Sequence, residues 1–190
     1  MSYRIKPLEK HDASLFTTYM GSLDFGHAPE WSTCYCVFYQ TPCDEKTWIE
    51  RTGETNRLTA IGNIESGVMR GFLAYDGDKI VGWVNANDAT ALTRISSLVK
   101  PIAGEKRVAA TMCYVIHPEY RGKGVARELL KAAIAYYRNE GFDAMIAMPF
   151  SSENAQKKYR GSVNMYLENG YQLIEKHGET SVLWLDLQEA

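Results

Sequence analysis

Hydrophobic and polar positions change their period several times along the chain. Residues 3–8 alternate as in a strand, whereas the apolar residues of 10–23 recur at helical spacing. Two runs rich in β-branched and aromatic residues, 68–75 and 79–87, flank Asp76-Gly77, a pair typical of tight hairpin turns. These patterns predict a strand, a helix and an antiparallel hairpin.

The clearest pattern lies in the second half of the chain. Val108–Ile116 is a continuous apolar run, which is typical of a strand buried on both faces. Residues 125–140 carry an apolar stripe at helical spacing and stop at Gly141, and residues 144–148 form a short apolar run. This order predicts a strand–helix–strand unit with a right-handed crossover and parallel pairing.

The remaining segments are less regular. Thr41 followed by Pro42 predicts the N-cap and first residue of a helix toward residue 64, weakened at Gly53 and Gly62. Residues 88–104 predict a loop with one helical turn. A polar loop, a short helix and a last pair of strands complete the prediction, over residues 149–161, 162–169, 171–175 and 182–187.

Composition limits what the chain can be. Its 190 residues are 45% hydrophobic and 23% charged, as expected for one globular domain spanning residues 1–190. The formal charge of −2 gives no general attraction to nucleic acid or anionic lipid, so we expect small-molecule partners. No apolar run reaches the roughly 20 residues of a membrane span, and the N-terminus has no hydrophobic signal core, which predicts a cytoplasmic protein.

The four cysteines suggest neither a disulfide framework nor a metal site. Cys34, Cys36 and Cys43 cluster, but their spacing matches no standard zinc pattern, even with His27 added. We therefore expect reduced thiols and no metal.

A glycine-containing loop joins the apolar strand to the following helix. Arg121-Gly122-Lys123-Gly124-Val125-Ala126 has two glycines that let the backbone turn sharply, and the helix start adds the positive end of its dipole. Such a loop can cradle a pyrophosphate, although a plain turn needs little more. It matches neither the P-loop pattern nor the dinucleotide fingerprint.

A second element follows downstream, where Tyr166 precedes Gly170-Tyr171 by four residues. Together with Arg121-x-x-Gly124-x-Ala126, this ordered pair resembles the GNAT superfamily of acyl-CoA-dependent N-acyltransferases over about residues 107–187. The resemblance implies an α/β fold with a mixed, mostly antiparallel sheet, a central parallel strand–helix–strand unit and flanking helices. It implies an acyl-CoA-binding core at residues 106–190 and an acceptor-binding part at residues 1–105.

The resemblance also implies which residues hold acetyl-CoA, the acyl donor. The loop Arg121, Gly122, Lys123, Gly124, Val125 and Ala126 corresponds to the pyrophosphate site, mostly through backbone groups. Tyr114, Val115 and Ile116 correspond to the strand that the pantetheine arm pairs with. Asn154 and Asn164 resemble the asparagine of the family that contacts CoA.

Acyl transfer from a thioester to an amine needs a neutral amine, a polarised carbonyl and a proton for the departing thiolate. Tyr166 fits the slot of the family's tyrosine, and its phenol is protonated at neutral pH. We expect it to be the proton donor, the alternative being a tyrosine that only packs its helix against the sheet.

The sequence does not identify the general base. Many relatives carry a glutamate on the central strand, whereas residues 111–116 contain no carboxylate. His117 at the strand end, an acidic or histidine side chain in the segment 24–30, and a water chain all stay open. A covalent route through Cys113 lacks an identifiable partner base.

An aromatic segment in the first part of the chain corresponds to the acceptor-binding region of the family. Trp31 and Tyr35 can be core or can form walls of an acceptor pocket, and Asp24 and Glu30 would favour a cationic amine. The expected function is thus transfer of an acetyl group from acetyl-CoA to a primary amine, directly and on a small molecule.

Two rival functions fit part of the pattern. The missing strand glutamate favours a non-catalytic acyl-CoA sensor of the same fold, which Tyr166 opposes. An RNA-binding module with Gly-x-x-Gly-like loop contacts is disfavoured by the slightly acidic charge. The sequence decides neither the acceptor nor whether the protein is a monomer or a homodimer.

Overall fold

The computed structural model describes residues 3–26, 28–152 and 155–188, with the side chains of residues 155–157 left aside. All described strands join in one seven-stranded sheet of order β1-β2-β3-β4-β5-β7-β6. Neighbouring strands are antiparallel except for β4 and β5. The strands are β1 (Arg4–Pro7), β2 (Gly71–Asp76), β3 (Lys79–Asp88), β4 (Val108–Ile116), β5 (Ala144–Ala147), β6 (Gln172–His177) and β7 (Thr180–Asp186).

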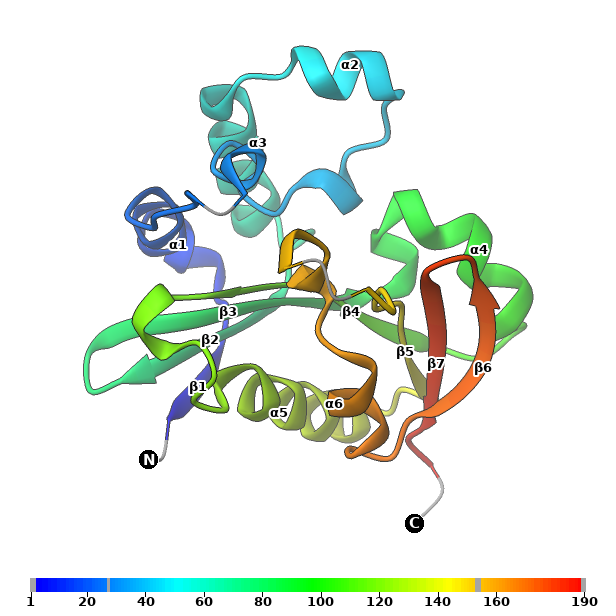
Figure 1. The fold of residues 1–190 in the computed structure, drawn as a ribbon. Coiled ribbons are helices and arrows are strands. Elements are labelled where there is room, and N and C mark those ends of the chain that lie inside the picture. The colour runs from blue at the N-terminus through cyan, green and yellow to red at the C-terminus, as the bar shows by residue number, and fades with distance from the viewer. Residues whose placement is uncertain (1–2, 27, 153–154, 189–190) are drawn as a thin grey trace.

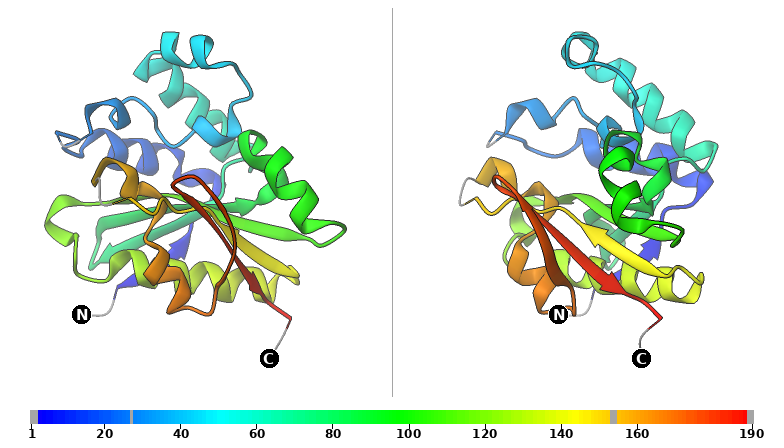
Figure 2. Two further views of the ribbon diagram at one scale, coloured as in Figure 1. Left: turned by 45° about the vertical axis from the view of Figure 1, so that its right-hand side comes forward. Right: turned by 90° about the vertical axis from the view of Figure 1, so that its right-hand side faces the viewer.

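Helices cover both faces of the sheet (Figure 1). One face carries α5 and α6, while the other carries α1, α3 and α4, with α2 further out (Figures 1 and 2). The α-helices are α1 (Ala13–Gly21), α2 (Glu45–Glu50), α3 (Gly53–Glu65), α4 (Thr93–Ala103), α5 (Val125–Asn139) and α6 (Val163–Leu167). The short 3₁₀ helices are η1 (Lys10–Asp12), η2 (Pro29–Trp31), η3 (Phe38–Gln40), η4 (Ala89–Ala91), η5 (Pro118–Tyr120) and η6 (Ala155–Arg160).

The two sheet faces build two apolar cores. Trp83 and Phe16 meet edge to face, with ring centroids 4.8 Å apart, in the core between the sheet and α1. Leu129 and Tyr137 of α5 are fully buried in the core on the opposite face. Because β4 contributes residues to both cores, its unbroken apolar run follows from its central place.

Several predicted elements are confirmed. The Asp76-Gly77 turn joins β2 to β3, and Gly77 adopts a φ of 59°. The strand–helix–strand unit has its parallel β4–β5 pair, and Gly141 follows α5 with a φ of 72°. Positive φ is the conformation in which glycine avoids the strain of a Cβ.

The expected long helix toward residue 64 is wrong in two respects. Asp44, rather than Thr41, caps α2, because its carboxylate accepts the Thr47 amide at 2.7 Å. The Thr41 hydroxyl instead donates to the Val37 carbonyl. The chain then leaves the helix at Arg51 and starts α3 with Thr52 as a new N-cap.

The expected loop at residues 88–104 is also wrong, since it contains α4. This helix buries Ile95 and Val99 against the sheet, and Gly104 ends it with a φ of 57°. Pro101 stands in its last turn, where one lost backbone hydrogen bond is offset by the packing of the apolar face. The predicted polar loop at residues 149–161 contains the 3₁₀ helix η6, and the other late elements differ from prediction by one or two residues at their ends. Among the described residues, no helix is long and apolar enough to cross a bilayer.

Two glycine substitutions test the packing of the sheet. A Cβ at Gly71 would lie 2.0 Å from the Val84 carbonyl oxygen and 2.4 Å from the Trp83 ring. We expect Gly71→Ala to lower the free energy of unfolding by about 1–3 kcal/mol, as overpacking does. In Gly62→Ala, on α3, the added Cβ meets nothing within 4 Å. This substitution should raise the free energy of unfolding by roughly 0.5–1 kcal/mol. Urea unfolding measures both, and equal effects would contradict this account.

Candidate active site

The sheet opens between β4 and β5. Their pairing ends where Thr111 lies opposite Ala147, while β4 continues to pair with β3 as far as Ile116. The β5-facing edge of residues 112–116 therefore has no strand partner, and another extended chain can lie along it. Side chains already bind two carbonyls of this segment, because the Tyr19 hydroxyl donates to Val115 at 3.0 Å and Arg121 donates to Ile116 at 3.3 Å. We call the cavity along this edge the cleft. Its described lining residues are Trp31, Tyr114, Val115, Ile116, Arg121, Ala126, Lys158, Tyr159 and Gly161.

A β-bulge lies at the same point of β4. Ala86 pairs with Thr111 and Val84 with Tyr114, so two residues of β4 face the single residue Asn85. As a result, Met112 and Cys113 both pack in the core beneath α1. The bulge thus turns the Cys113 thiol to one face and leaves Thr111 and Tyr114 on the other.

The glycine loop forms a shallow anion cradle at the end of the cleft. Gly122 and Gly124 have φ angles of 71° and 84°, and a Cβ on either would meet nothing within 4 Å. Gly124 is the N-cap of α5, and no side chain of the described residues caps this helix. The first amides of α5 therefore point into the cradle without an intrahelical partner, which suits an anion. The cradle is lined by Ile116, Tyr120, Arg121, Gly122, Gly124, Val125, Ala126, Arg127, Ser162 and Met165.

Most of the residues expected to contact CoA lie together here. Lys123 is exposed and does not line the cradle, although its carbonyl accepts the Tyr3 hydroxyl at 3.4 Å. Asn164 is exposed on α6 and lines neither cavity, and Asn154 lies outside the described residues. Sequence reasoning missed Ser162 and Met165, for which the serine N-cap of α6 is the available signal.

Tyr166 is fully buried beside the cleft. Its hydroxyl donates to the Arg160 carbonyl at 2.8 Å and lies 3.0 Å from the Thr111 hydroxyl at the point where the strands part. Burial raises the pKa of Tyr166 to about 12, so its phenol stays protonated at neutral pH. Two residues that line the cleft adjoin it: a Cβ on Gly161 would lie 3.3 Å from its oxygen, and the Tyr114 hydroxyl lies 3.4 Å from it.

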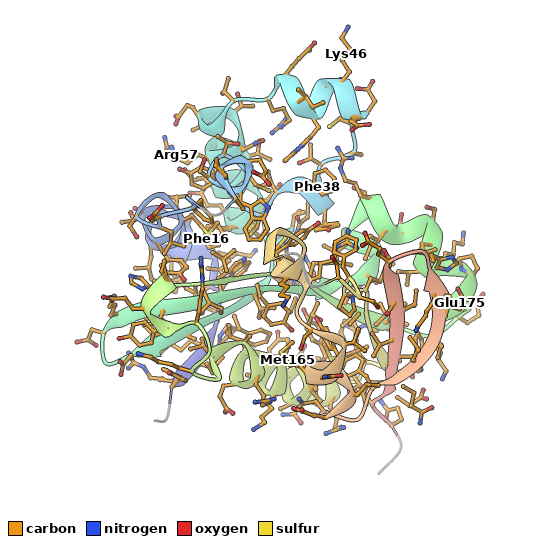
Figure 3. The ribbon with its side chains drawn as sticks, viewed as in Figure 1. Phe16, Phe38, Lys46, Arg57, Met165 and Glu175 are labelled. Atoms are coloured by element: carbon orange, nitrogen blue, oxygen red, sulfur yellow. The ribbon has the colours of Figure 1, made fainter. Side chains whose placement is uncertain are left out.

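A second cavity lies on the opposite side of the sheet from Met165, near Phe38 (Figure 3). We call this the aromatic pocket, and its volume is about 210 Å³. Of the residues expected to contact the acceptor, Glu30 and Trp31 line it, whereas Asp24 and Tyr35 do not. The lining residues are Met20, Glu30, Trp31, Cys34, Cys36, Phe38, Tyr39, Trp48, Cys113, Val115 and Tyr159.

Asp24 and Tyr35 have structural environments of their own. The Asp24 carboxylate accepts the Gly26 amide at 2.7 Å in a tight turn. Tyr35 and Cys36 both adopt left-handed backbone conformations, with φ of 45° and 55°. The buried Asn85 amide donates to the Cys36 carbonyl at 3.2 Å, which ties this strained turn to the strand opposite the bulge.

Two thiols of the aromatic pocket, Cys34 and Cys36, have raised pKa values. Burial raises the pKa of Cys34 to about 12, and a hydrogen bond with Cys113, together with burial, raises the pKa of Cys36. A nucleophilic thiolate is thus disfavoured at neutral pH. All four cysteines are free, and the described residues contain no group of three or more Cys, His, Asp or Glu that can hold a metal ion.

The candidates for the general base are spread out. His117 caps η5 at the end of β4, where its Nδ1 accepts the Glu119 amide at 3.4 Å and its ring meets Tyr120. It lines neither the cleft nor the aromatic pocket. His27 lies outside the described residues. Glu30 is the one carboxylate among the described residues that line the aromatic pocket.

The family model of the acetyltransferase (GNAT) family matches residues 30–171 of this chain. The chain belongs to the GNAT family. It is an acyl-CoA-dependent N-acetyltransferase. No curated protein matches the sequence.

Solved GNAT structures share the fold across nearly the whole chain. The structure of yncA, a putative acetyltransferase from Salmonella typhimurium with its cofactor acetyl-CoA, has a TM-score of 0.57 at 16% identity, covering 100% of this chain and 96% of that one. The PaiA N-acetyltransferase from Thermoplasma acidophilum with coenzyme A has a TM-score of 0.56 at 13% identity, covering 98% of this chain and 99% of that one. A polyamine N-acetyltransferase from Drosophila melanogaster that forms N-acetylagmatine has a TM-score of 0.56 at 14% identity, covering 97% of this chain and 100% of that one.

The geometry of this GNAT chain fits its donor. The uncapped start of α5 and the open space at Gly122 and Gly124 suit a pyrophosphate, and the unpaired edge of β4 suits the amides of the pantetheine arm. The Arg121 side chain is exposed, and its Nε donates to the Ile116 carbonyl at 3.3 Å. The second arginine that lines the cradle, Arg127, forms an ion pair with Glu168.

Gly124→Glu should reduce CoA affinity by at least tenfold, because a carboxylate at the helix start repels the pyrophosphate. Gly141→Glu at the other end of α5 is the matched control. Both glycines have positive φ and open space around a Cβ, so both variants bear a similar strain of roughly 1–2 kcal/mol. Calorimetric titration with CoA measures the difference, and equal affinities in the two folded variants would contradict the cradle.

Proposed function

We propose that this enzyme transfers the acetyl group directly to the primary amine of a small molecule held in the aromatic pocket. The observation that carries the proposal is that Trp31, Val115 and Tyr159 line both the cleft and the aromatic pocket. A donor in the cleft and an amine in the pocket would therefore meet at these residues, from opposite sides of the β4 edge.

The pocket also suits an amine chemically. Glu30 offers a negative charge for the ammonium group, and the aromatic walls offer apolar surface for the body of the molecule. The Drosophila polyamine N-acetyltransferase forms N-acetylagmatine from a small amine, which supports this substrate class. At about 210 Å³ the pocket is smaller than the roughly 300–1,000 Å³ of drug-sized sites, which favours a small acceptor over a peptide.

We assign the two parts of the chain different tasks. Residues 1–105 contribute most of the aromatic pocket, and residues 106–190 contribute the cradle and most of the cleft. Bound acetyl-CoA supplies a thioester whose carbonyl carbon accepts the amine and whose sulfur departs. The raised pKa of the Cys34 and Cys36 thiols disfavours an acyl-cysteine at either of these two residues, which supports direct transfer.

Tyr166 is the proposed proton donor. Its hydroxyl stays protonated and needs to turn only from the Arg160 carbonyl toward the cleft past Gly161. In the same water-poor site the pKa of a departing thiol also rises, which favours proton transfer from a phenol. Thr111, 3.0 Å away, can hold the phenol in place while it acts.

The proposal predicts enzyme-dependent CoA release from acetyl-CoA in the presence of at least one small primary amine. A panel of primary amines, alcohols and short peptides measures this, with mass spectrometry locating the acetyl group on nitrogen. Release with alcohols or peptides alone, or with no acceptor of the panel while CoA still binds, would overturn it.

Tyr166→Phe should lower kcat by about 10²–10⁴-fold, the usual range for a general acid, with little change in acetyl-CoA affinity. Tyr171→Phe is the matched control, because Tyr171 is buried against the Tyr166 ring at 5.1 Å and its hydroxyl has no hydrogen-bond partner among the described residues. Turnover at saturating acetyl-CoA measures both. A Tyr166→Phe rate within about threefold of wild type would reduce Tyr166 to a packing residue.

A further inference from the structure

We propose that the acceptor carries a single ammonium group on an apolar body, preferably an aromatic ring, and that the pocket discriminates against polyamines. This inference rests on the proposed function, because it names the substrate class of the same site. Three features of the aromatic pocket carry it: its walls, its single carboxylate and the cations behind its walls.

The walls form a box of rings in edge-to-face contact. Phe38 lies 4.9 Å from Trp48, and Trp31 lies 5.2 Å from Tyr159, centroid to centroid. Phe38 also meets Tyr39 at 5.1 Å. Such rings favour an apolar or aromatic guest through burial and through further edge-to-face contacts. An extended polyamine chain, with charges at both ends, would bury ammonium groups against these walls without partners.

The pocket offers one site for a positive charge. Glu30 is the one charged side chain among its described lining residues, and it is exposed at η2. The other polar lining groups are tyrosine hydroxyls, indole nitrogens and thiols. Burial raises the pKa of the Cys34 thiol and keeps it protonated, so this residue provides no second anion for another ammonium group.

Three arginines stand behind the walls. The Arg94 guanidinium carbon lies 4.1 Å from the Phe38 centroid, that of Arg51 lies 5.8 Å from Trp48, and that of Arg160 lies 5.6 Å from Tyr159. None of them lines the pocket.

The hydrogen-bond partners of these three arginines are neutral groups, which do not cancel the guanidinium charge. Arg94 donates to the Thr41 carbonyl and the Cys43 sulfur, Arg51 to Asn56 and Thr59, and Arg160 to the Tyr39 hydroxyl and the Met148 carbonyl. Within the described residues none of the three forms an ion pair. Although the exposed Asp44 carboxylate offsets part of the Arg94 charge, the three guanidinium groups repel a second ammonium and occupy aromatic faces that a cationic ligand would use.

The deciding experiment compares kcat/KM for 2-phenylethylamine, for hexylamine and for spermidine and agmatine, using purified enzyme and saturating acetyl-CoA. We expect both monoamines to exceed the two multiply charged amines by at least tenfold, with 2-phenylethylamine highest. Equal or higher values for spermidine or agmatine would overturn this inference and leave the proposed function standing. An enzyme that binds CoA but acetylates no primary amine would overturn both.

Two pairs of variants locate the effect in the pocket. Trp48→Ala should raise the KM for 2-phenylethylamine at least tenfold, whereas Trp184→Ala on β7, outside the pocket, should leave it within twofold. Glu30→Gln should raise the KM for both monoamines, and Glu65→Gln at the end of α3 should not. Quenching of tryptophan fluorescence by 2-phenylethylamine in the presence of CoA gives a second readout, independent of turnover. Unchanged KM and quenching in Trp48→Ala would contradict an aryl-binding wall.

Discussion

The site depends on the parting of two parallel strands. A parallel pair satisfies the backbone groups of both strands, and ending that pair at Thr111 and Ala147 leaves half of β4 with an open edge inside the sheet. Exposed edge groups need a partner, and an extended amide-bearing donor can supply one. The separation of the two strands makes room for the cleft. It also leaves Thr111 beside the Tyr166 hydroxyl, and the chain continues from the end of β4 to the cradle at Gly124.

The bulge couples this opening to the aromatic pocket. Its extra residue turns Cys113 toward the pocket, and Asn85 on the facing strand holds the left-handed turn at Tyr35 and Cys36. Left-handed conformations cost roughly 1–2 kcal/mol for each such residue, so a buried hydrogen bond at this point has a structural purpose. Gln40 donates to the same Asn85 side chain at 3.3 Å. One strand position opposite the bulge thus holds both the Tyr35–Cys36 turn and Gln40.

Charge is distributed differently on the two sides. The cradle relies on backbone amides and a helix dipole, which are fixed in direction and need no side-chain ordering. The aromatic pocket instead separates its charges, with Glu30 at the pocket and arginines such as Arg94 behind the rings. On the proposed function, a chain with a formal charge of only −2 thus binds an anion at one site and a single cation at the other.

The sequence alone determined those elements whose conformation depends on residues close together in the chain. The Asp76-Gly77 turn, the apolar run of β4 and the positive-φ glycines of the cradle depend on neighbouring residues, so one chain predicts them. Tertiary structure decided the rest. It formed α4 despite Pro101, because burial of its apolar face outweighs a lost hydrogen bond, and it brought Trp31 against Tyr159 across more than a hundred residues. A contact between distant segments leaves no periodic signal in a single sequence, which is why the pocket, unlike the cradle, needed the folded chain.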